Sequence, residues 1–261
     1  MKDKKKDLAA ALSFIDGLVR RIDRKRVYPR STVYTDIVLL ALLSKSLRVG
    51  RAVCALVEAG YGEEAFGLTR TLIDIFLTAH FISNKDEAKR AEQYAKFTFK
   101  EKEAWLSIVE KYFAGAFLAD ERLRKEILKE AKPFPNPHWW TGPGHTKRLA
   151  QEPDTREFDA NGNPLTCEFD YEVLYKWTSQ YVHCTASSLD SHLAREFGVF
   201  KTMRRDQRLR FDDLALLNAL TYSLKVAITV SRYLGVPLSK RTGNRFQDIV
   251  RRNLIPAPRG F

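Results

Sequence analysis

Residues 65–82 read AFGLTRTLIDIFLTAHFI, and this stretch decides the fold class. Only Arg70 and Asp74 carry certain charges within it. A helix built from these residues is apolar on nearly every side, which predicts that it lies buried inside its domain. Because Gly60 and Gly62 mark a turn just before the stretch, we expect the helix to span about 63–83.

The segments on both sides repeat apolar residues at helical spacing. We expect further helices at about 7–26, 32–59, 86–113, 117–131, 170–197 and 211–234. No segment alternates apolar and polar residues with the β-branched enrichment of a strand, so we expect no sheet. The predicted fold class is therefore all-α, a single bundle of about seven helices.

Residues 132–168 interrupt this helical pattern. They hold six of the ten prolines of the chain and show neither helical nor strand periodicity. A connection of this length inside a compact domain is usually functional or disordered. Since Phe134, Trp139 and Trp140 are large apolar side chains that favour burial, we expect the loop to pack over the helical body.

The net charge of +12 is concentrated at the two ends of the chain. Residues 1–30 have a net charge of +6 and residues 201–261 one of +9, whereas residues 31–200 have −3. We therefore divide the chain into a basic N-terminal helix (1–30), a helical core (31–235) and a basic tail (236–261). The basic ends could contact the phosphates of RNA or DNA, form a solvated surface, or dock on a partner protein or a second copy of the chain.

Composition and short motifs exclude several classes of protein. No apolar run reaches the roughly 20 residues of a membrane-spanning helix, and the N-terminus lacks an apolar signal-peptide region, so we expect neither feature. The three cysteines have no Cys-x-x-Cys spacing, which favours a reducing cytoplasm. Without Glu-x-x-His, His-x-x-x-His or a cysteine cluster, we expect no metal. Glycine-rich phosphate-binding loops are also missing, so we expect no nucleotide cofactor.

Arg70 and Asp74 are the first candidate site residues. They lie four residues apart on one face of a helix, where they can pair directly. Removing water from each charge costs several kcal/mol by order of magnitude. A buried pair of this kind therefore either clasps neighbouring helices or serves a functional site.

The segment 170–197 carries a second group of polar side chains. Tyr171, Tyr175, Ser179 and His183 follow one another at intervals of four. His183 is a candidate general acid or base because its ordinary pKa lies near neutrality, although a ring satisfied inside the core is the alternative. Asp190 would lie about 10.5 Å further along such a helix, which is too far to orient His183 in a catalytic triad.

The candidate site residues fall into a catalytic group and a substrate-binding group, and the long loop contributes Trp140 and His145 to the second group. The catalytic candidates are Arg70, Asp74 and His183, and the candidate substrate contacts are Tyr175, Ser179, His145 and Trp140.

Two blocks of the sequence resemble an uncharacterised all-helical microbial family, the domain of unknown function DUF5677. The first block is AGYGEEA at 59–65 followed by LTRTLID at 68–74, and the second runs from Tyr171 through Tyr175 and Ser179 to His183. The family usually has glutamate where this chain has Asp74, a change that keeps the charge but shortens its reach. The resemblance implies an all-helical fold and, by looser analogy, a kinship with the helical ribonuclease-like domains called HEPN.

HEPN ribonucleases cleave RNA with an Arg-x-x-x-x-His motif. This chain has no arginine five residues before a histidine, so Arg70 and His183 from two different helices would have to take that role. Two functions stay open. One is an RNase-like component of a bacterial defence or toxin system, and the other is a non-catalytic helical module that binds a small anionic ligand or a protein partner.

Overall fold

The computed structural model describes residues 33–113, 121–135, 140–183, 193–196, 199–203 and 208–236, together with scattered positions between 6 and 20. Seven α-helices lie within these ranges: α2 (Val33–Glu58), α3 (Gly62–Asn84), α4 (Glu87–Tyr112), α5 (Glu121–Ala131), α6 (His145–Gln151), α7 (Lys176–Val182) and α9 (Arg208–Tyr233). A π-helical segment, η1 (Asp170–Tyr175), runs directly into α7. The predicted all-α fold class is confirmed.

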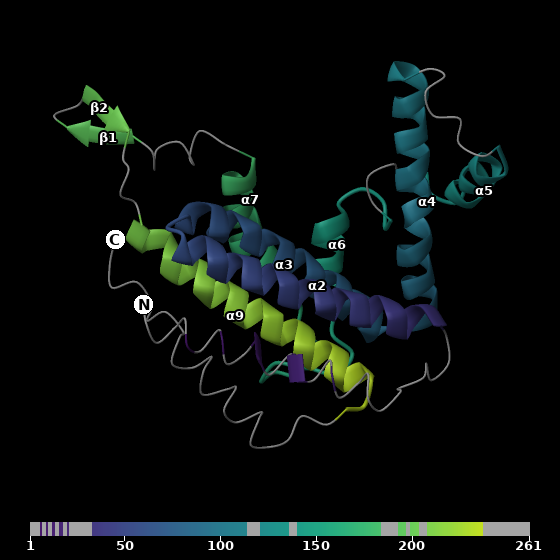
Figure 1. Cartoon of the computed structure of the whole chain (residues 1–261). Helices are drawn as coiled ribbons and strands as arrows, with labels where there is room; N and C mark the ends of the chain where they lie inside the picture. Colours follow the sequence, from purple (N-terminus) through teal and green to yellow (C-terminus); the bar gives the residue numbers. More distant parts are fainter. Residues whose placement is uncertain are drawn as a thin grey trace.

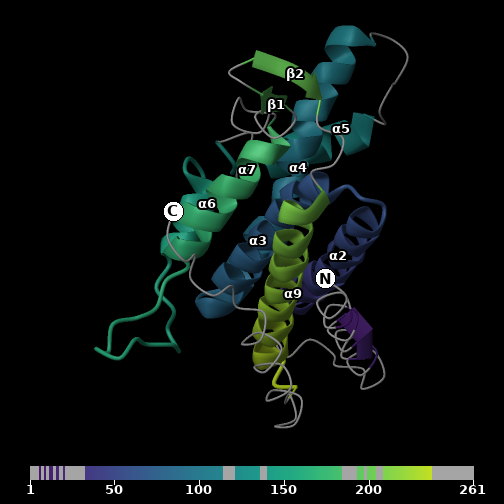
Figure 2. The ribbon, with the colours of Figure 1, turned by 90° about the vertical axis from the view of Figure 1, so that its left-hand side faces the viewer.

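Helices α2, α3 and α9 pack side by side and form the core (Figure 1). Figure 2 shows α3 with α7 on one side and α9 on the other. As its sequence predicts, α3 is the central buried helix. Its fully buried side chains meet those of the two neighbouring helices, and the largest are Phe66, Leu72, Ile73, Leu77 and Ile82 from α3, Leu39 and Leu43 from α2, and Tyr222 from α9. Each such apolar side chain contributes about 1.5–3 kcal/mol by leaving water.

The start of α3 requires a glycine because α9 approaches it closely. A Cβ atom built on Gly62 would lie 2.1 Å from Oδ1 of Asp212. A larger residue at this position would have to displace the Asp212 side chain, and its Cβ would also lie only 3.0 Å from the Asp212 backbone nitrogen. The predicted turn before α3 thus also lies at a close contact between α3 and α9.

The long loop packs over the end of α3, as predicted, and it contains the short helix α6, which the sequence analysis missed. The last turn of a helix leaves carbonyl groups without partners. Here Arg90 Nη1 donates to the Phe81 carbonyl at 2.6 Å, Thr155 Oγ1 donates to the Asn84 carbonyl at 3.2 Å, and Arg156 donates to the Ser83 carbonyl. The contacts of Thr155 and Arg156 hold the loop against the bundle, and that of Arg90 joins α4 to the end of α3.

The predicted helix at 170–197 agrees with η1 and α7 up to Val182 and is wrong at 193–196, where the chain forms a strand; residues 184–192 lie outside the described residues. Helix α7 ends at Val182, and two strands, β1 (Leu193–Glu196) and β2 (Val199–Met203), pair as an antiparallel hairpin with Leu193 opposite Met203. The expectation of no sheet is corrected by this hairpin, which lies away from the core helices (Figure 1). Strand β2 contains the strand-favouring Val199, Phe200 and Thr202.

Two core helices are long and apolar enough, by length and composition alone, to cross a membrane: α3 and the part of α9 from Phe211 to Tyr233. In the bundle, 72% and 67% of their most apolar windows are buried inside the protein. Burial of this extent is the pattern of core helices, so their apolar character has an explanation in the packing itself.

The predictions for the two chain ends lie largely outside the described residues. Within the first twenty residues, Leu12 is buried and Asp16 forms an ion pair with Arg51 of α2. The division into a basic helix at 1–30, a core at 31–235 and a basic tail at 236–261 stays a prediction.

Candidate functional site

Arg70 of α3 is in contact with two of the other predicted site residues. Its Nη1 lies 2.9 Å from Nε2 of His183, and its Nη2 donates to the hydroxyl of Tyr175 at 2.7 Å. Tyr175 is the last residue of η1, and His183 follows directly after α7. The packing of α7 against α3 therefore joins residues that are 113 positions apart in the sequence.

The contact between Arg70 and His183 defines the state of the imidazole. A guanidinium group has only N–H donors, so Nε2 of His183 must accept the hydrogen bond. The ring is then neutral with its proton on Nδ1, a tautomer inferred from the partner atom. Because His183 is exposed, its Nε2 lone pair becomes a proton acceptor open to solvent whenever Arg70 moves to another partner.

Tyr175 holds the guanidinium group in place. The Cζ atom of Arg70 lies 4.8 Å from the centre of the buried tyrosine ring. Thr146 of α6 donates to the same hydroxyl at 3.4 Å, and Tyr171 stacks on the ring with centroids 5.5 Å apart. A π-helical turn is frequent at functional sites, and η1 is the turn that carries both tyrosines.

Asp74 lies one helical turn from Arg70 but does not clasp it. Among the described residues, the guanidinium group bonds to Tyr175 and His183, and no ion pair joins it to the Asp74 carboxylate. Burial raises the pKa of Asp74 to about 6, although the charges of Arg70 and Lys45 act in the opposite direction. A carboxyl group whose pKa is moved toward neutrality by burial is typical of functional sites.

The Nε atom of Arg70 is buried and has no hydrogen-bond partner among the described residues. An unsatisfied buried donor costs about 1–3 kcal/mol. The guanidinium group of Arg70 is therefore positively charged, but its hydrogen-bond partners, Tyr175 and His183, are neutral. Its Nε donor has no hydrogen-bond partner among the described residues. This incomplete pairing distinguishes the Arg70 site from an ordinary structural ion pair.

The remaining predicted site residues make contacts within the fold. Ser179 donates to the Tyr175 carbonyl at 2.7 Å, so its hydroxyl is used within its own helix. His145 is buried with its Nδ1 2.6 Å from Oγ1 of Thr141, and burial lowers its pKa to about 4. Trp140 is also buried and packs edge-on against Phe81, Tyr94 and His145.

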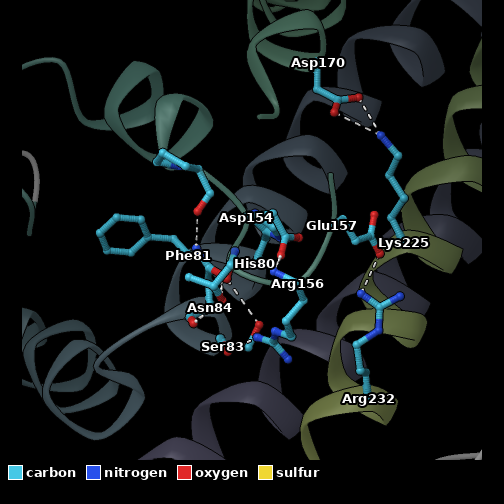
Figure 3. Close-up of polar contacts among 12 residues, drawn as sticks. His80, Phe81, Ser83, Asn84, Asp154, Arg156, Glu157, Asp170, Lys225 and Arg232 are labelled. Carbon is cyan, nitrogen blue, oxygen red and sulfur yellow. Dashed lines mark hydrogen bonds and ion pairs between the residues drawn. The ribbon is translucent and has the colours of Figure 1, made fainter. Parts of the chain in front are cut away.

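The structure also brings together polar residues that the sequence analysis missed. A cavity of about 320 Å³ lies between α3, the segment 154–170 and α9. His80 and Asp154 lie on one side of it, and Lys225 and Arg232 of α9 on the other (Figure 3). The available signal was Lys225, the single charged residue of α9 between Asp213 and Arg232. Within the described part of the chain, no group of three or more His, Cys, Asp or Glu residues could hold a metal ion.

Comparison with known proteins identifies a family but no characterised relative. Residues 36–199 match the model of a family of unknown function, DUF5677. Neither the curated proteins nor the solved structures contain a match to the chain.

Proposed function

Since the chain belongs to the DUF5677 family of unknown function, we propose its activity from the site alone: an RNase-like protein that cleaves RNA at Arg70 and His183. The contact between the Arg70 guanidinium and the neutral His183 imidazole carries the proposal. It places a cation that can hold a phosphate beside a group that can accept a proton. The wider role that we propose is a component of a bacterial defence or toxin system in the cytoplasm.

The chemistry needs one proton acceptor and one anion-binding group. The 2′-hydroxyl of the RNA attacks the adjacent phosphorus and transfers its proton to Nε2 of His183. Arg70 leaves His183 and donates to the oxygens of the five-coordinate phosphorus, on which negative charge accumulates. The bond to the 5′-oxygen breaks, and this oxygen takes a proton from water, while the hydroxide left behind takes the proton back from the His183 imidazolium. The products are a 2′,3′-cyclic phosphate and a 5′-hydroxyl end.

The surroundings of Arg70 favour a phosphate over a carboxylate of the protein as its partner. Its two hydrogen-bonded partners, Tyr175 and His183, carry no charge that would neutralise it. An approaching phosphodiester would supply that charge and form charge-assisted hydrogen bonds, which are roughly twice as strong as neutral ones. We propose that the basic ends of the chain, 1–30 and 236–261, bind the rest of the RNA backbone.

The test is cleavage of an end-labelled single-stranded RNA of about 30 nucleotides containing all four bases, with the all-deoxy strand of the same sequence beside it. We expect cyclic-phosphate products from the RNA only, because the deoxy strand lacks the nucleophile. His183→Ala should reduce the rate by about 10²–10⁴-fold, the usual contribution of a general base. Arg70→Lys should also lose activity, because an ammonium group cannot replace the planar guanidinium.

Arg124→Ala provides the matched control, since Arg124 is a half-buried arginine of α5 that pairs with Glu110 of α4, outside the Arg70 site. Its activity should equal that of the wild type. Intact RNA under all conditions, with and without added divalent ions, would refute the proposal. Equal cleavage by the wild type and His183→Ala would also refute it, because the activity would then belong to a contaminant.

The alternative is a non-catalytic module that binds a small anion at the same arginine. The unused Nε of Arg70 favours this function, because an anion is the partner that such a donor lacks. Titration calorimetry with inorganic phosphate and with adenosine monophosphate separates the two functions. Binding that Arg70→Lys weakens, together with uncut RNA, supports the module, whereas cutting of RNA supports the nuclease.

A further inference from the structure

The cavity between α3, the segment 154–170 and α9 is separate from the Arg70 site and is not used by the proposed function. Its volume of about 320 Å³ is at the lower end of the range of small-molecule sites. Three apolar side chains form part of its wall: Phe76, Leu165 and Ile228. The rest of the wall is polar, and its charges indicate what kind of molecule fits.

Two of the three carboxylates in the wall have a cation of the protein as partner. Nζ of Lys225 donates to both oxygens of Asp170, at 2.7 and 3.0 Å, and Arg232 donates to Glu157 at 2.6 Å (Figure 3). These two pairs are neutral overall. They therefore attract neither an anion nor a cation strongly.

Asp154 is the third carboxylate, and its partners are neutral. Oδ1 accepts the backbone N–H of Arg156 at 2.7 Å, and Oδ2 lies 3.8 Å from Nδ1 of His80. Burial lowers the pKa of His80 below its ordinary 6.5 although the Asp154 charge acts in the opposite direction, so the neutral imidazole predominates at neutral pH. Asp154 is only 8% exposed, and a buried carboxylate without a positive partner is costly. With His80 neutral, the wall of the cavity has a net charge of −1.

We propose that this cavity binds a small organic cation, with an ammonium or guanidinium group at Asp154 and a short apolar body against Phe76 and Ile228. The charge of the ligand neutralises the unpaired carboxylate, and its body fills the apolar part of the wall. The acidic groups are spread around the cavity, and no three among the described residues could hold a metal ion. An extended organic cation matches this spread better than a single metal ion does.

The test compares three probes of nearly equal shape by titration calorimetry on the full chain: benzylamine, benzyl alcohol and benzoate. Benzylamine should bind at least about tenfold more tightly than benzyl alcohol, since a hydrogen bond to a charged partner is worth roughly that factor. Benzoate should give no measurable heat of binding. Equal affinities, or tighter binding of benzoate, would overturn the proposal.

Asp154→Asn keeps an oxygen for the Arg156 N–H and removes only the charge. It should lower the affinity for benzylamine to that for benzyl alcohol. Glu168→Gln removes the same charge from an exposed residue that bonds to Gln151 outside the cavity, and it should leave benzylamine binding unchanged. If both variants bind benzylamine as the wild type does, the inferred site is wrong.

A second variant tests the location without relying on Asp154. Thr229→Phe places a ring into the cavity and leaves every charge in the wall in place. It should abolish benzylamine binding while the circular dichroism spectrum and the RNA-cleavage assay stay at wild-type values. Unchanged benzylamine binding in this variant would place the ligand elsewhere and refute the proposal, whatever the outcome of the RNA assay.

Discussion

Replacing Asp74 by asparagine should stabilise the protein at neutral pH. The folded state raises the pKa of this carboxyl group from 3.8 to about 6, mainly through burial. Above pH 6 the Asp74 carboxyl group is therefore ionised in both states, and its charge has a higher free energy buried in the folded protein than in water in the unfolded chain. At 1.36 kcal/mol per pKa unit, the folded state is penalised by up to about 3 kcal/mol at pH 7.5. Asparagine has nearly the same shape and no charge, so Asp74→Asn removes this penalty.

The sign of the effect follows from which state binds the proton. Between pH 3.8 and pH 6 the folded state keeps a proton that the unfolded state has lost, so the wild type gains stability as the pH falls. At pH 4 only about 0.5 kcal/mol of the penalty remains. The stability difference between Asp74→Asn and the wild type should thus decrease by about 2–3 kcal/mol between pH 7.5 and pH 4.

Urea unfolding followed by circular dichroism at pH 4, 5, 6 and 7.5 measures this difference. The slope of free energy against urea should be equal in both proteins, so that the midpoint alone reports stability. Glu126→Gln on α5 is the control, because Glu126 is exposed and should give no pH-dependent difference. The reasoning is refuted if Asp74→Asn is less stable than the wild type at pH 7.5 and if this loss of stability is larger at pH 7.5 than at pH 4. That result would mean that the ionised Asp74 and Arg70 stabilise the fold as a pair.

Three further results are expected. Burial lowers the pKa of His145 from 6.5 to about 4, so its contribution to stability is complete above pH 6.5 and is lost as the pH falls toward 4. His145→Gln should reduce this loss of stability by at most about 3 kcal/mol. The difference in urea midpoints between pH 6.5 and pH 4 measures the effect. Gly62→Ala should destabilise the fold by about 1–3 kcal/mol, because its Cβ would overlap the Asp212 side chain. Gly17→Ala, with no atom within 4 Å of the added Cβ, should leave the melting temperature nearly unchanged. Deleting both basic ends should weaken RNA binding and flatten its dependence on salt concentration in fluorescence anisotropy, and an unchanged salt slope would show that the ends do not contact phosphates.

The local pattern of side chains was sufficient to predict the core helices. The bounds expected for the segments at 32–59, 63–83 and 86–113 agree with α2, α3 and α4 within a few residues. Helical periodicity is a property of neighbours along the chain, so it can be seen without knowing the fold. The same argument failed at 193–196, because this strand is stabilised by pairing with β2, which no helical pattern reveals.

The identity of the polar groups in the candidate site was also contained in the sequence. Arg70 and Asp74 are conspicuous because charges in a helix that is otherwise apolar are costly to bury. Their partners were not predictable in the same way. The sequence offered Asp74 as the ion-pair partner of Arg70, and only the family resemblance implied His183. The packing of α7 on α3 brought His183 and Tyr175 to the guanidinium group.

The sequence by itself therefore determined the class of fold, the burial of α3 and the presence of two charged residues in this apolar helix, since all three depend on the type and spacing of nearby residues. The tertiary structure alone decided which charge meets which partner. His80, Asp154 and Lys225 line one cavity although they come from three distant segments of the chain. Contacts of this kind depend on how whole helices pack, and the free energy of a charge depends on those contacts rather than on its neighbours in sequence.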